Sequence, residues 1–325
     1  MQVIKPEARI IDINFGCDVL KKIEMVGRTC YKSTDLIKED SAPKFVANLI
    51  NRGHEAMLEH ASFCFSLPHK EWRGLQTIIK NTEKYDGFNC FLRFTESNTK
   101  TLVSGNVRAW RDFMKVCYET TGCLPLYFKK FIESNPVLFP EFQSRINYLG
   151  LKDVNMIPVT IYDLTSEDEF LTHCDVTVRF VVDRGVSHEL VRHRPASFAQ
   201  ESTRYCNYGK DKFGGQIRFI LPEFFQDDSP EWDIWKNVME MCEFAYLRMI
   251  ELGVTPEKAR TVLPNSLKTE VIMTANCAEW RHFFNLRACN STGKAHPQML
   301  EVCRPLLDEF KDTIENVFDG LTYGE

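Results

Sequence analysis

The sequence predicts a fold that mixes strands with long helices. Apolar and polar residues alternate over 176–182, which is typical of a strand. Apolar residues recur at helical spacing over 235–252 and again over 298–318, which predicts two long amphipathic helices. The chain has 325 residues, of which 44% are hydrophobic and 26% are charged, so its composition is that of an ordinary globular protein with a large core.

The N-terminal half predicts several short elements. One or two strands are expected within 2–13, and another over 62–67. Between them, Ser41-Ala42-Pro43 supplies a cap and an early proline for a helix that Gly53 ends. The following region carries no motif with a chemical meaning, and its pattern predicts a helix over 70–84, strands near 90–94 and 100–103, a helix over 106–119 and a strand over 159–162.

In the C-terminal half, the strand over 176–182 leads into a short helix over 187–191. Pro195 disfavours the helical conformation at Arg194, so the helix is expected to stop there. The last predicted helices carry long apolar rows, which could also form a contact between subunits of an oligomer. The remaining expected elements are a strand over 216–221, a helix over 235–252 closed by Gly253, a helix from Thr255 to Pro264, a strand-like segment over 267–275, and helices over 280–288 and 298–318.

Charge and hydropathy limit the classes of function. A formal net charge of -5 argues against a protein that mainly coats nucleic acid. The N-terminus lacks the apolar core of a signal peptide, and no apolar run approaches the length of a membrane span. We therefore expect a soluble, cytoplasmic protein. None of the 12 cysteines forms a Cys-x-x-Cys pair, so we interpret most of them as buried free thiols rather than zinc ligands.

The stretch 192–205 concentrates three arginines, a histidine and two serines. Because Arg192, His193 and Arg194 follow a predicted helix, one interpretation is that they only interact with the helix dipole. Clustered guanidinium groups repel each other, however, and are usually tolerated around a planar anion such as phosphate, carboxylate or an ionised base. We therefore favour a binding site for a small anionic ligand.

A metal site is the first alternative, because His54, Glu55, Glu59 and His60 lie close together in the sequence. A helical zinc pair needs two histidines four residues apart, on one face of the helix. The two histidines of this segment are six apart, and His188 and His193 are five apart. These spacings disfavour a Cys/His metal hydrolase, and we expect no metal.

A family resemblance rests on several blocks. Arg192-His193-Arg194, followed after seven residues by Ser202 and then by Arg204-Tyr205, closely resembles the signature of flavin-dependent thymidylate synthases. The matching blocks cover roughly 21–66 and 174–304, whereas residues 68 to about 172 resemble an insertion into a single catalytic domain over 1–325. The other blocks, in the order of the family, are Gly27-Arg28-Thr29-Cys30, Arg52-Gly53-His54-Glu55 with Glu59-His60, Ala259 to Pro264, and Asn276 to Arg287.

The resemblance implies a fold and an activity. The fold is α+β, with a mixed or antiparallel sheet flanked by long helices, in a homotetramer whose active sites are shared between subunits. The activity is the reductive methylation of dUMP to dTMP, with 5,10-methylenetetrahydrofolate as the carbon donor. NADPH is the reductant, and FAD carries the hydride, so that no activated cysteine is required.

The resemblance also implies roles for individual residues. Arg287 matches the arginine that favours loss of the N3 proton of uracil. Ala199, Gln200 and Ala278 depart from the commonest residues of the family, and the change at Ala278 puts one flavin contact in doubt. The implied flavin contacts are His60, Ser62, Arg192, His193, Arg194, Asn276, Ala278 and His282, and the implied dUMP contacts are Glu189, Gln200, Ser202, Arg204, Arg260 and Arg287.

Elementary chemistry agrees with these roles. Arg204 and Arg260 suit a phosphate as bidentate donors, and a guanidinium near the uracil ring stabilises the charge that develops there. Ser202 has no His–acid pair beside it in the sequence, so we interpret it as a substrate contact rather than a nucleophile. The second alternative is a nucleotide- or single-strand-binding module that uses the same arginines, with stacking on Phe198, Tyr205 and Tyr208. The acidic net charge disfavours it.

Overall fold

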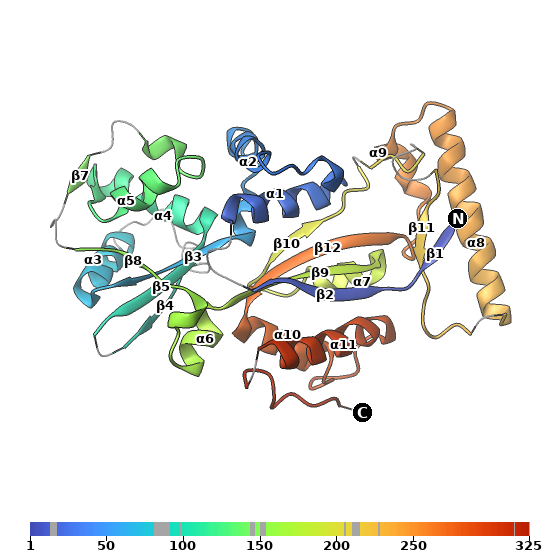
Figure 1. Cartoon of the computed structure of the whole chain (residues 1–325). Helices are drawn as coiled ribbons and strands as arrows, with labels where there is room; N and C mark the ends of the chain where they lie inside the picture. Colours follow the sequence, from blue (N-terminus) through green and yellow to red (C-terminus); the bar gives the residue numbers. More distant parts are fainter. Residues whose placement is uncertain are drawn as a thin grey trace.

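The computed structural model describes residues 1–13, 18–80, 92–97, 99–143, 147–149, 154–204, 206–209, 215–226, 228–314 and 316–324. Its architecture is α+β, as expected. A four-stranded antiparallel sheet lies at the centre of the molecule, with helices on both faces (Figure 1). Its strands, in spatial order, are β10 (Ser197–Gln200), β12 (Lys268–Asn276), β9 (Asp175–Asp183) and β2 (Glu7–Ile13).

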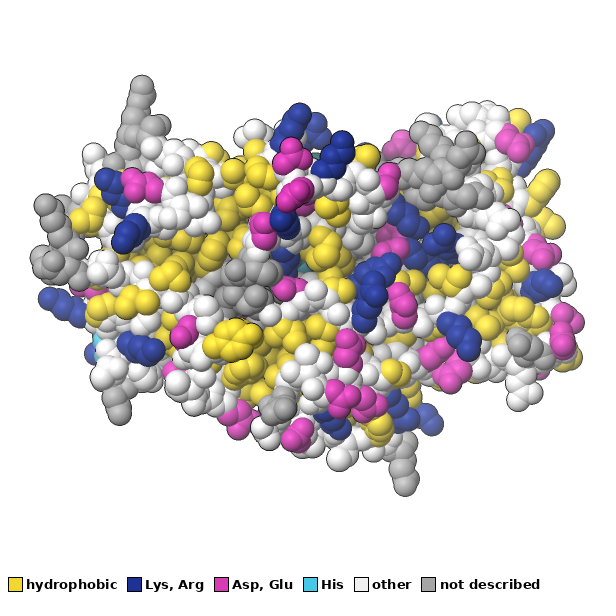
Figure 2. All heavy atoms as spheres, in the orientation of Figure 1, with side chains coloured by type: hydrophobic (Ala, Val, Ile, Leu, Met, Phe, Trp, Pro, Cys, Tyr) yellow, Lys and Arg dark blue, Asp and Glu magenta, His cyan; other side chains and the backbone are white. Residues whose placement is uncertain are grey.

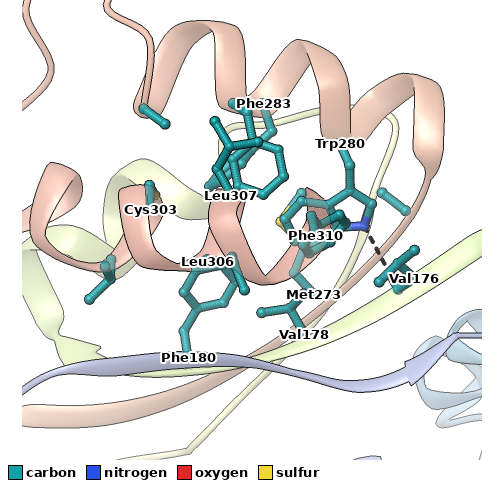
Figure 3. Packing of buried hydrophobic residues seen from close by; sticks show 14 of the residues in the cluster. Val176, Val178, Phe180, Met273, Trp280, Phe283, Cys303, Leu306, Leu307 and Phe310 are labelled. Atoms are coloured by element: carbon teal, nitrogen blue, oxygen red, sulfur yellow. Dashed lines mark hydrogen bonds between the residues drawn. The ribbon is translucent and has the colours of Figure 1, made fainter. Parts of the chain in front are cut away.

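One face of the central sheet is covered by α10 (Cys277–Arg287) and α11 (Pro297–Thr313). Alternate residues of β9, among them Val178 and Phe180, point toward these helices and pack against Trp280 and Phe310 (Figure 3). The indole nitrogen of Trp280 also donates to the carbonyl oxygen of Val176 at 3.0 Å. The apolar rows predicted over 280–288 and 298–318 therefore form core, and α11 ends at Thr313, before the predicted end.

The other face of the central sheet receives α1 (Val19–Cys30), through a small cluster in which Val26 and Cys30 contact Ala199 and Ile272. The strands alternate their side chains between the two faces, so polar residues of β9 and β12 also point this way. Behind α1 lies α2 (Ala42–Asn51), which has the predicted early proline and is followed by Gly53 at a φ of +70°. The neighbouring 3-10 helices are η1 (Thr34–Leu36) and η2 (Glu55–His60).

Residues 62–158 build a second antiparallel sheet beside the first (Figure 1). Its strands, in spatial order, are β4 (Leu92–Glu96), β5 (Thr101–Asn106), β3 (Ser62–Leu67) and β8 (Ile157–Pro158). Trp110 and Phe113 of this region share one core with Ile23, Val46 and Leu58 from α1, α2 and η2. Its helices and small elements are α3 (His69–Lys80), α4 (Val107–Thr121), α5 (Phe128–Ser134), η4 (Pro140–Phe142), and the strands β6 (Leu124–Pro125) and β7 (Tyr148–Leu149).

A third cluster of apolar residues lies at the other end of the molecule. The parallel pair β1 (Gln2–Ile4) and β11 (Arg218–Ile220) packs there against α8 (Pro230–Glu251). The short α9 (Pro256–Ala259) and η7 (Arg260–Val262) complete it. None of the helices in the part of the chain that the structure describes is long and apolar enough to cross a membrane.

Three sequence predictions need correction. The strand predicted over 159–162 is wrong, because Thr160 and Asp163 form a capping box that opens the 3-10 helix η5 (Ile161–Asp163). The helix predicted over 187–191 is α7 (Arg184–Leu190), which begins earlier because Asp183 caps it. The long helix α8 begins at Pro230 rather than Trp235, because Ser229 caps it and proline suits its first turn.

Candidate functional site

The turn after α7 exposes two arginines and buries the histidine between them. Arg192 and Arg194 are exposed, whereas His193 is only 7% exposed. The helix-capping interpretation treats the three residues alike, but the structure places the histidine differently from the two arginines. Two guanidinium groups face solvent from one short turn, and the imidazole points into the protein.

The buried imidazole contacts Arg287, which the sequence placed in another block. The Nε of Arg287 donates to Nε2 of His193 at 3.0 Å, and its Nη1 donates to Oε2 of Glu189 at 2.8 Å. Burial lowers the pKa of His193 to about 4, and the charge of Arg287 adds to the effect. Since Nε2 accepts a hydrogen bond from a guanidinium, the neutral ring carries its proton on Nδ1. Three predicted site residues thus form one hydrogen-bonded group.

The first turns of α10 carry three more predicted residues. Asn276 ends β12 and caps α10, because its side chain accepts from the backbone N–H of Glu279 at 2.9 Å. Its amide nitrogen donates to the carbonyl of Thr172 at 3.2 Å, so the side chain is held on both sides. Ala278 and His282 are exposed on the next turn, and the His282 ring lies 6.3 Å from that of His193.

His60 is fully buried and lies against the central sheet. Its Nδ1 is 2.8 Å from Oγ1 of Thr274, whereas its Nε2 is buried without a hydrogen-bond partner among the described residues. Burial, with the charge of Lys22, lowers the pKa of His60 to about 3. A buried polar atom that lacks a partner is unfavourable, so this nitrogen marks a place where a bound group would be stabilising.

Ser62 and Asn276 line one small cavity at the ends of β3 and β12, together with Ser197 at the start of β10. The cavity has a volume of about 40 Å³, which holds about one water molecule. Within one chain it therefore accepts a single polar group, not a ring system.

The same cavity is lined by Arg93, which sequence reasoning missed. Both Nη atoms of Arg93 bind the carboxylate of Asp175, at 2.7 and 2.9 Å. Burial opposes ionisation of Asp175, but the Arg93 guanidinium outweighs it and lowers the pKa of the carboxyl. Arg93 belongs to the segment that resembles an insertion, where no motif signalled it, so the sequence held no clue to this pair.

Gln200 lies at the end of β10 and faces α7. Its amide nitrogen donates to Oγ of Ser187 at 2.9 Å and lies 3.4 Å from Oγ1 of Thr269. Ser187 and Glu189 belong to the same helix, so Gln200 lies on the side of the sheet that carries the Arg287 group. The uncharged amide is thus accommodated by two hydroxyl groups.

Ser202, Arg204 and Arg260 occupy the loops beyond β10. The Ser202 hydroxyl accepts from the backbone N–H of Arg204 at 3.3 Å, and the Arg260 guanidinium donates to Oγ1 of Thr203 at 3.4 Å. Arg204 is exposed and lies 3.4 Å from a carboxylate oxygen of Glu257. Two exposed guanidinium groups beside a serine form a set of donors that suits a phosphate.

The aromatic residues of the alternative binding module are not displayed for stacking. Phe198 is half-buried and packs against the central core, and Tyr208 is 5% exposed with its hydroxyl 3.2 Å from Glu201. Tyr205 lies outside the described residues. The burial of Tyr208 contradicts its place in the stacking surface of this alternative, and Phe198 is only partly accessible for it. As for metals, no group of three His, Cys, Asp or Glu side chains that could hold an ion occurs among the described residues.

Comparison with known proteins identifies the C-terminal half of the chain. Residues 164–314 match the family model described as thymidylate synthase complementing protein. A flavin-dependent thymidylate synthase of Pyrococcus furiosus is 37% identical over 126 residues, which cover 39% of this chain and 50% of that protein. One of Thermococcus onnurineus is 33% identical over 164 residues, or 50% of this chain and 64% of the relative. The aligned part thus spans about half of the length of these curated relatives.

One solved structure that aligns with this chain is the UMP/dUMP methylase PolB from Streptomyces cacaoi, bound with 5-Br dUMP. The alignment covers 98% of this chain and 96% of the PolB chain, with 13% sequence identity and a TM-score of 0.42. The match over 164–314 includes the Arg192-His193-Arg194 turn, the strands β9, β10 and β12, and Arg287. Through this segment, the chain is similar to the flavin-dependent thymidylate synthases.

Proposed function

We propose that the protein is an FAD-dependent thymidylate synthase, which forms dTMP by reductive methylation of dUMP. In this proposal 5,10-methylenetetrahydrofolate donates the carbon, and NADPH is the reductant. The observation that carries the proposal is the oriented guanidinium of Arg287, held by His193 at 3.0 Å and by Glu189 at 2.8 Å, inside the segment that matches the family.

Arg287 is the proposed catalytic residue. Two of its five N–H donors bind His193 and Glu189, so the plane of the guanidinium is fixed before a ligand arrives. Its side chain is 22% exposed, so it remains accessible to a ligand. A guanidinium beside the imide edge of uracil stabilises the negative charge that develops as C5 becomes nucleophilic. His193 supports this role because the neutral ring adds no competing positive charge.

The substrate contacts are proposed to divide between the ring and the phosphate. Glu189 and Gln200 lie on the Arg287 side of the sheet and suit the polar edge of uracil. Ser202, Arg204 and Arg260 lie beyond the end of β10 and suit the phosphate.

FAD, when bound, supplies the hydride that completes the methyl group. Arg192 and Arg194 are two exposed cations on one turn, which suits a pyrophosphate. The unpartnered Nε2 of His60 and the cavity lined by Ser62 and Asn276 offer polar groups nearby, at the sheet edge. The other residues proposed to contact the flavin are His193, Ala278 and His282.

Assembly into a homotetramer with shared active sites belongs to the proposal. The cavity of about 40 Å³ in one chain does not enclose a flavin ring, so the proposal places part of the ring against a second subunit. Helix α8 supports assembly, because Ile234, Val238, Met241 and Phe244 are 67%, 49%, 65% and 65% exposed. These side chains recur at intervals of three and four residues and form an apolar stripe that water would otherwise cover.

A reducing, cytoplasmic location is also proposed. It is supported by the cysteines, because none of the ten in the part of the chain that the structure describes forms a disulfide, and eight of them are buried.

Absorption spectroscopy followed by product analysis tests the function. The purified protein is examined for flavin bands, with added FAD if needed, and then mixed anaerobically with NADPH and dUMP. Bleaching of the bands, followed by dTMP formation when methylenetetrahydrofolate is added, is the expected result. A protein that stays colourless and does not take up FAD would contradict the proposal.

A further inference from the structure

Two adjoining hollows lie on the α1 side of the central sheet, away from the Arg287 group. The first, here called the sheet hollow, has a volume of about 340 Å³ and is lined by Arg9, Lys32 and Arg179. The second, the β11 hollow, has a volume of about 360 Å³ and shares Lys32 with the first. Figure 2 shows Lys and Arg side chains around a depression in the region that lies between α1 and β11 in Figure 1.

Two arginines face each other across the floor of the sheet hollow. Arg9 of β2 and Arg179 of β9 are register partners, so both point away from the α10–α11 core. Arg179 is held by Glu270, at 2.7 and 3.0 Å, and by Glu7, at 3.3 Å, whereas Arg9 is exposed. The two carboxylates offset the charge of Arg179. Arg9 is therefore the cation of this pair that a bound anion would meet first.

The lysines are oriented by carboxylates behind them. Glu201 is 2% exposed and binds both Lys32, at 3.3 Å, and Lys268, at 2.9 Å. Lys268 also contacts Glu270. Burial lowers the pKa of Lys32, and the neighbouring charge of Lys268 acts in the same direction. The buried carboxylates therefore hold the two lysines at the wall of the hollows.

The charge of the lining is opposite in sign to that of the whole chain. Among the described residues, five cationic side chains and two carboxylates, Asp35 and Glu270, line the two hollows, although the chain carries a net charge of -5. Lys32 lines both hollows, and Arg218 lines the β11 hollow. A ligand with several negative charges along its length would meet a cation in each hollow.

The floor of the sheet hollow is apolar. Ile11, Met25 and Ile272 form it, from β2, α1 and β12. A flat ring can lie on such a floor, while its charged substituents reach the arginines and Lys32. A simple inorganic ion would leave this apolar surface uncovered.

We propose that the two hollows bind a nucleotide, with its base on the floor formed by Ile11, Met25 and Ile272 and its phosphate chain along Arg9, Lys32 and Arg218. Guanidinium groups pair bidentately with phosphate oxygens, and the several cations of the lining favour a ligand with several negative charges over a single carboxylate. The lining of the sheet hollow lies on the opposite face of the sheet from Gln200 and Arg287, so it does not overlap with that part of the proposed thymidylate synthase site.

Isothermal titration calorimetry of the whole protein with ATP, pyrophosphate and adenosine tests the site. ATP is expected to bind more tightly than either fragment, because only ATP uses both the floor and the cations. No binding of ATP, or pyrophosphate binding as tightly as ATP, would overturn the assignment to a nucleotide.

Variants at two exposed cations locate the binding. Arg9→Gln and Arg218→Gln remove one charge from each hollow without emptying the core, and each is expected to weaken ATP binding about tenfold, with roughly a hundredfold loss in the double variant. Arg248→Gln, on the exposed surface of α8, is the matched control and should bind like the wild type. If Arg204→Gln abolishes ATP binding and the Arg9 and Arg218 variants do not, ATP binds at the proposed dUMP site and the inference is wrong.

Discussion

The Nε of Arg287 donates to Nε2 of His193 at 3.0 Å, across 94 residues of sequence. This contact fixes the tautomer of the histidine and the orientation of the arginine at once. It also explains why a histidine stands between two exposed arginines, since the ring is an acceptor for a third arginine inside the protein.

Replacing Arg287 by alanine should separate catalysis from flavin binding. The variant loses the oriented donor, and we expect dTMP formation to fall by about 10²- to 10³-fold, while the flavin absorption bands are retained. Steady-state rates and visible spectra of the same preparation check this. Arg287→Lys is the matched control, because it keeps the charge but loses the planar donor geometry, and it should recover only a part of the rate. A variant with the wild-type rate would exclude Arg287 from the chemistry.

The same variant should raise the pKa of His193. Burial and the charge of Arg287 together lower that pKa to about 4, so loss of the charge should move it upward toward the ordinary value of about 6.5. Titration of the imidazole by NMR measures the shift. A pKa that does not change would mean that the two side chains are not in contact in solution.

Arg192 is expected to hold flavin and to contribute little to the fold. It is exposed, so Arg192→Ala should leave the free energy of unfolding within about 0.5 kcal/mol of the wild type. The FAD content of the purified variant, or its affinity for added FAD, should fall. Exposed Arg52→Ala, outside the turn, provides a comparison that should retain FAD. Equal flavin content in both variants would contradict the role of Arg192.

The Arg93–Asp175 pair should stabilise the contact between the two sheets. Asp175 is 4% exposed, so Arg93→Met leaves a carboxylate buried without its guanidinium and should lower the free energy of unfolding by about 3–5 kcal/mol. Arg93→Lys restores the charge without the bidentate geometry and should show a smaller loss. Chemical denaturation of both variants decides the point. A loss of under about 1 kcal/mol in Arg93→Met would show that the pair is not important for stability.

His173 should make stability depend on pH. Its ring binds Ser104 at 2.7 Å and Thr95 at 2.9 Å, and burial lowers its pKa to about 4, with Arg93 contributing. The unfolded chain, with a pKa of about 6.5, binds this proton more readily, so the contribution is complete above about pH 6.5 and is lost as the pH falls toward 4. The loss amounts to about 3 kcal/mol, at 1.36 kcal/mol per unit of pKa. Chemical denaturation at several pH values between 7 and 4 measures the free energy of unfolding. This free energy should fall less with falling pH in His173→Gln than in the wild type. Exposed His54→Gln should retain the wild-type slope, and an unchanged slope in His173→Gln would rule the histidine out.

The sequence by itself determined the features that depend on neighbouring residues. The alternation over 176–182 and the apolar rows over 280–288 and 298–318 became β9, α10 and α11, because burial of one face needs only the correct period. The cluster from Arg192 to Arg204 likewise identified the candidate site. Two errors arose at helix starts, where one cap residue, Asp183 or Ser229, sets the boundary. The strand predicted over 159–162 and the end of the last helix were also wrong.

Only the tertiary structure decided which distant side chains meet. The register of β12 against β9 and β10 places Gln200 on one face of the sheet and Glu201 on the other, since a shift of one residue would exchange the two faces. That register leads Glu201 to the lysines of the hollows and Gln200 to Ser187. Arg93 meets Asp175 because the second sheet lies beside the first, a long-range arrangement that no spacing within the segment 68–172 could reveal.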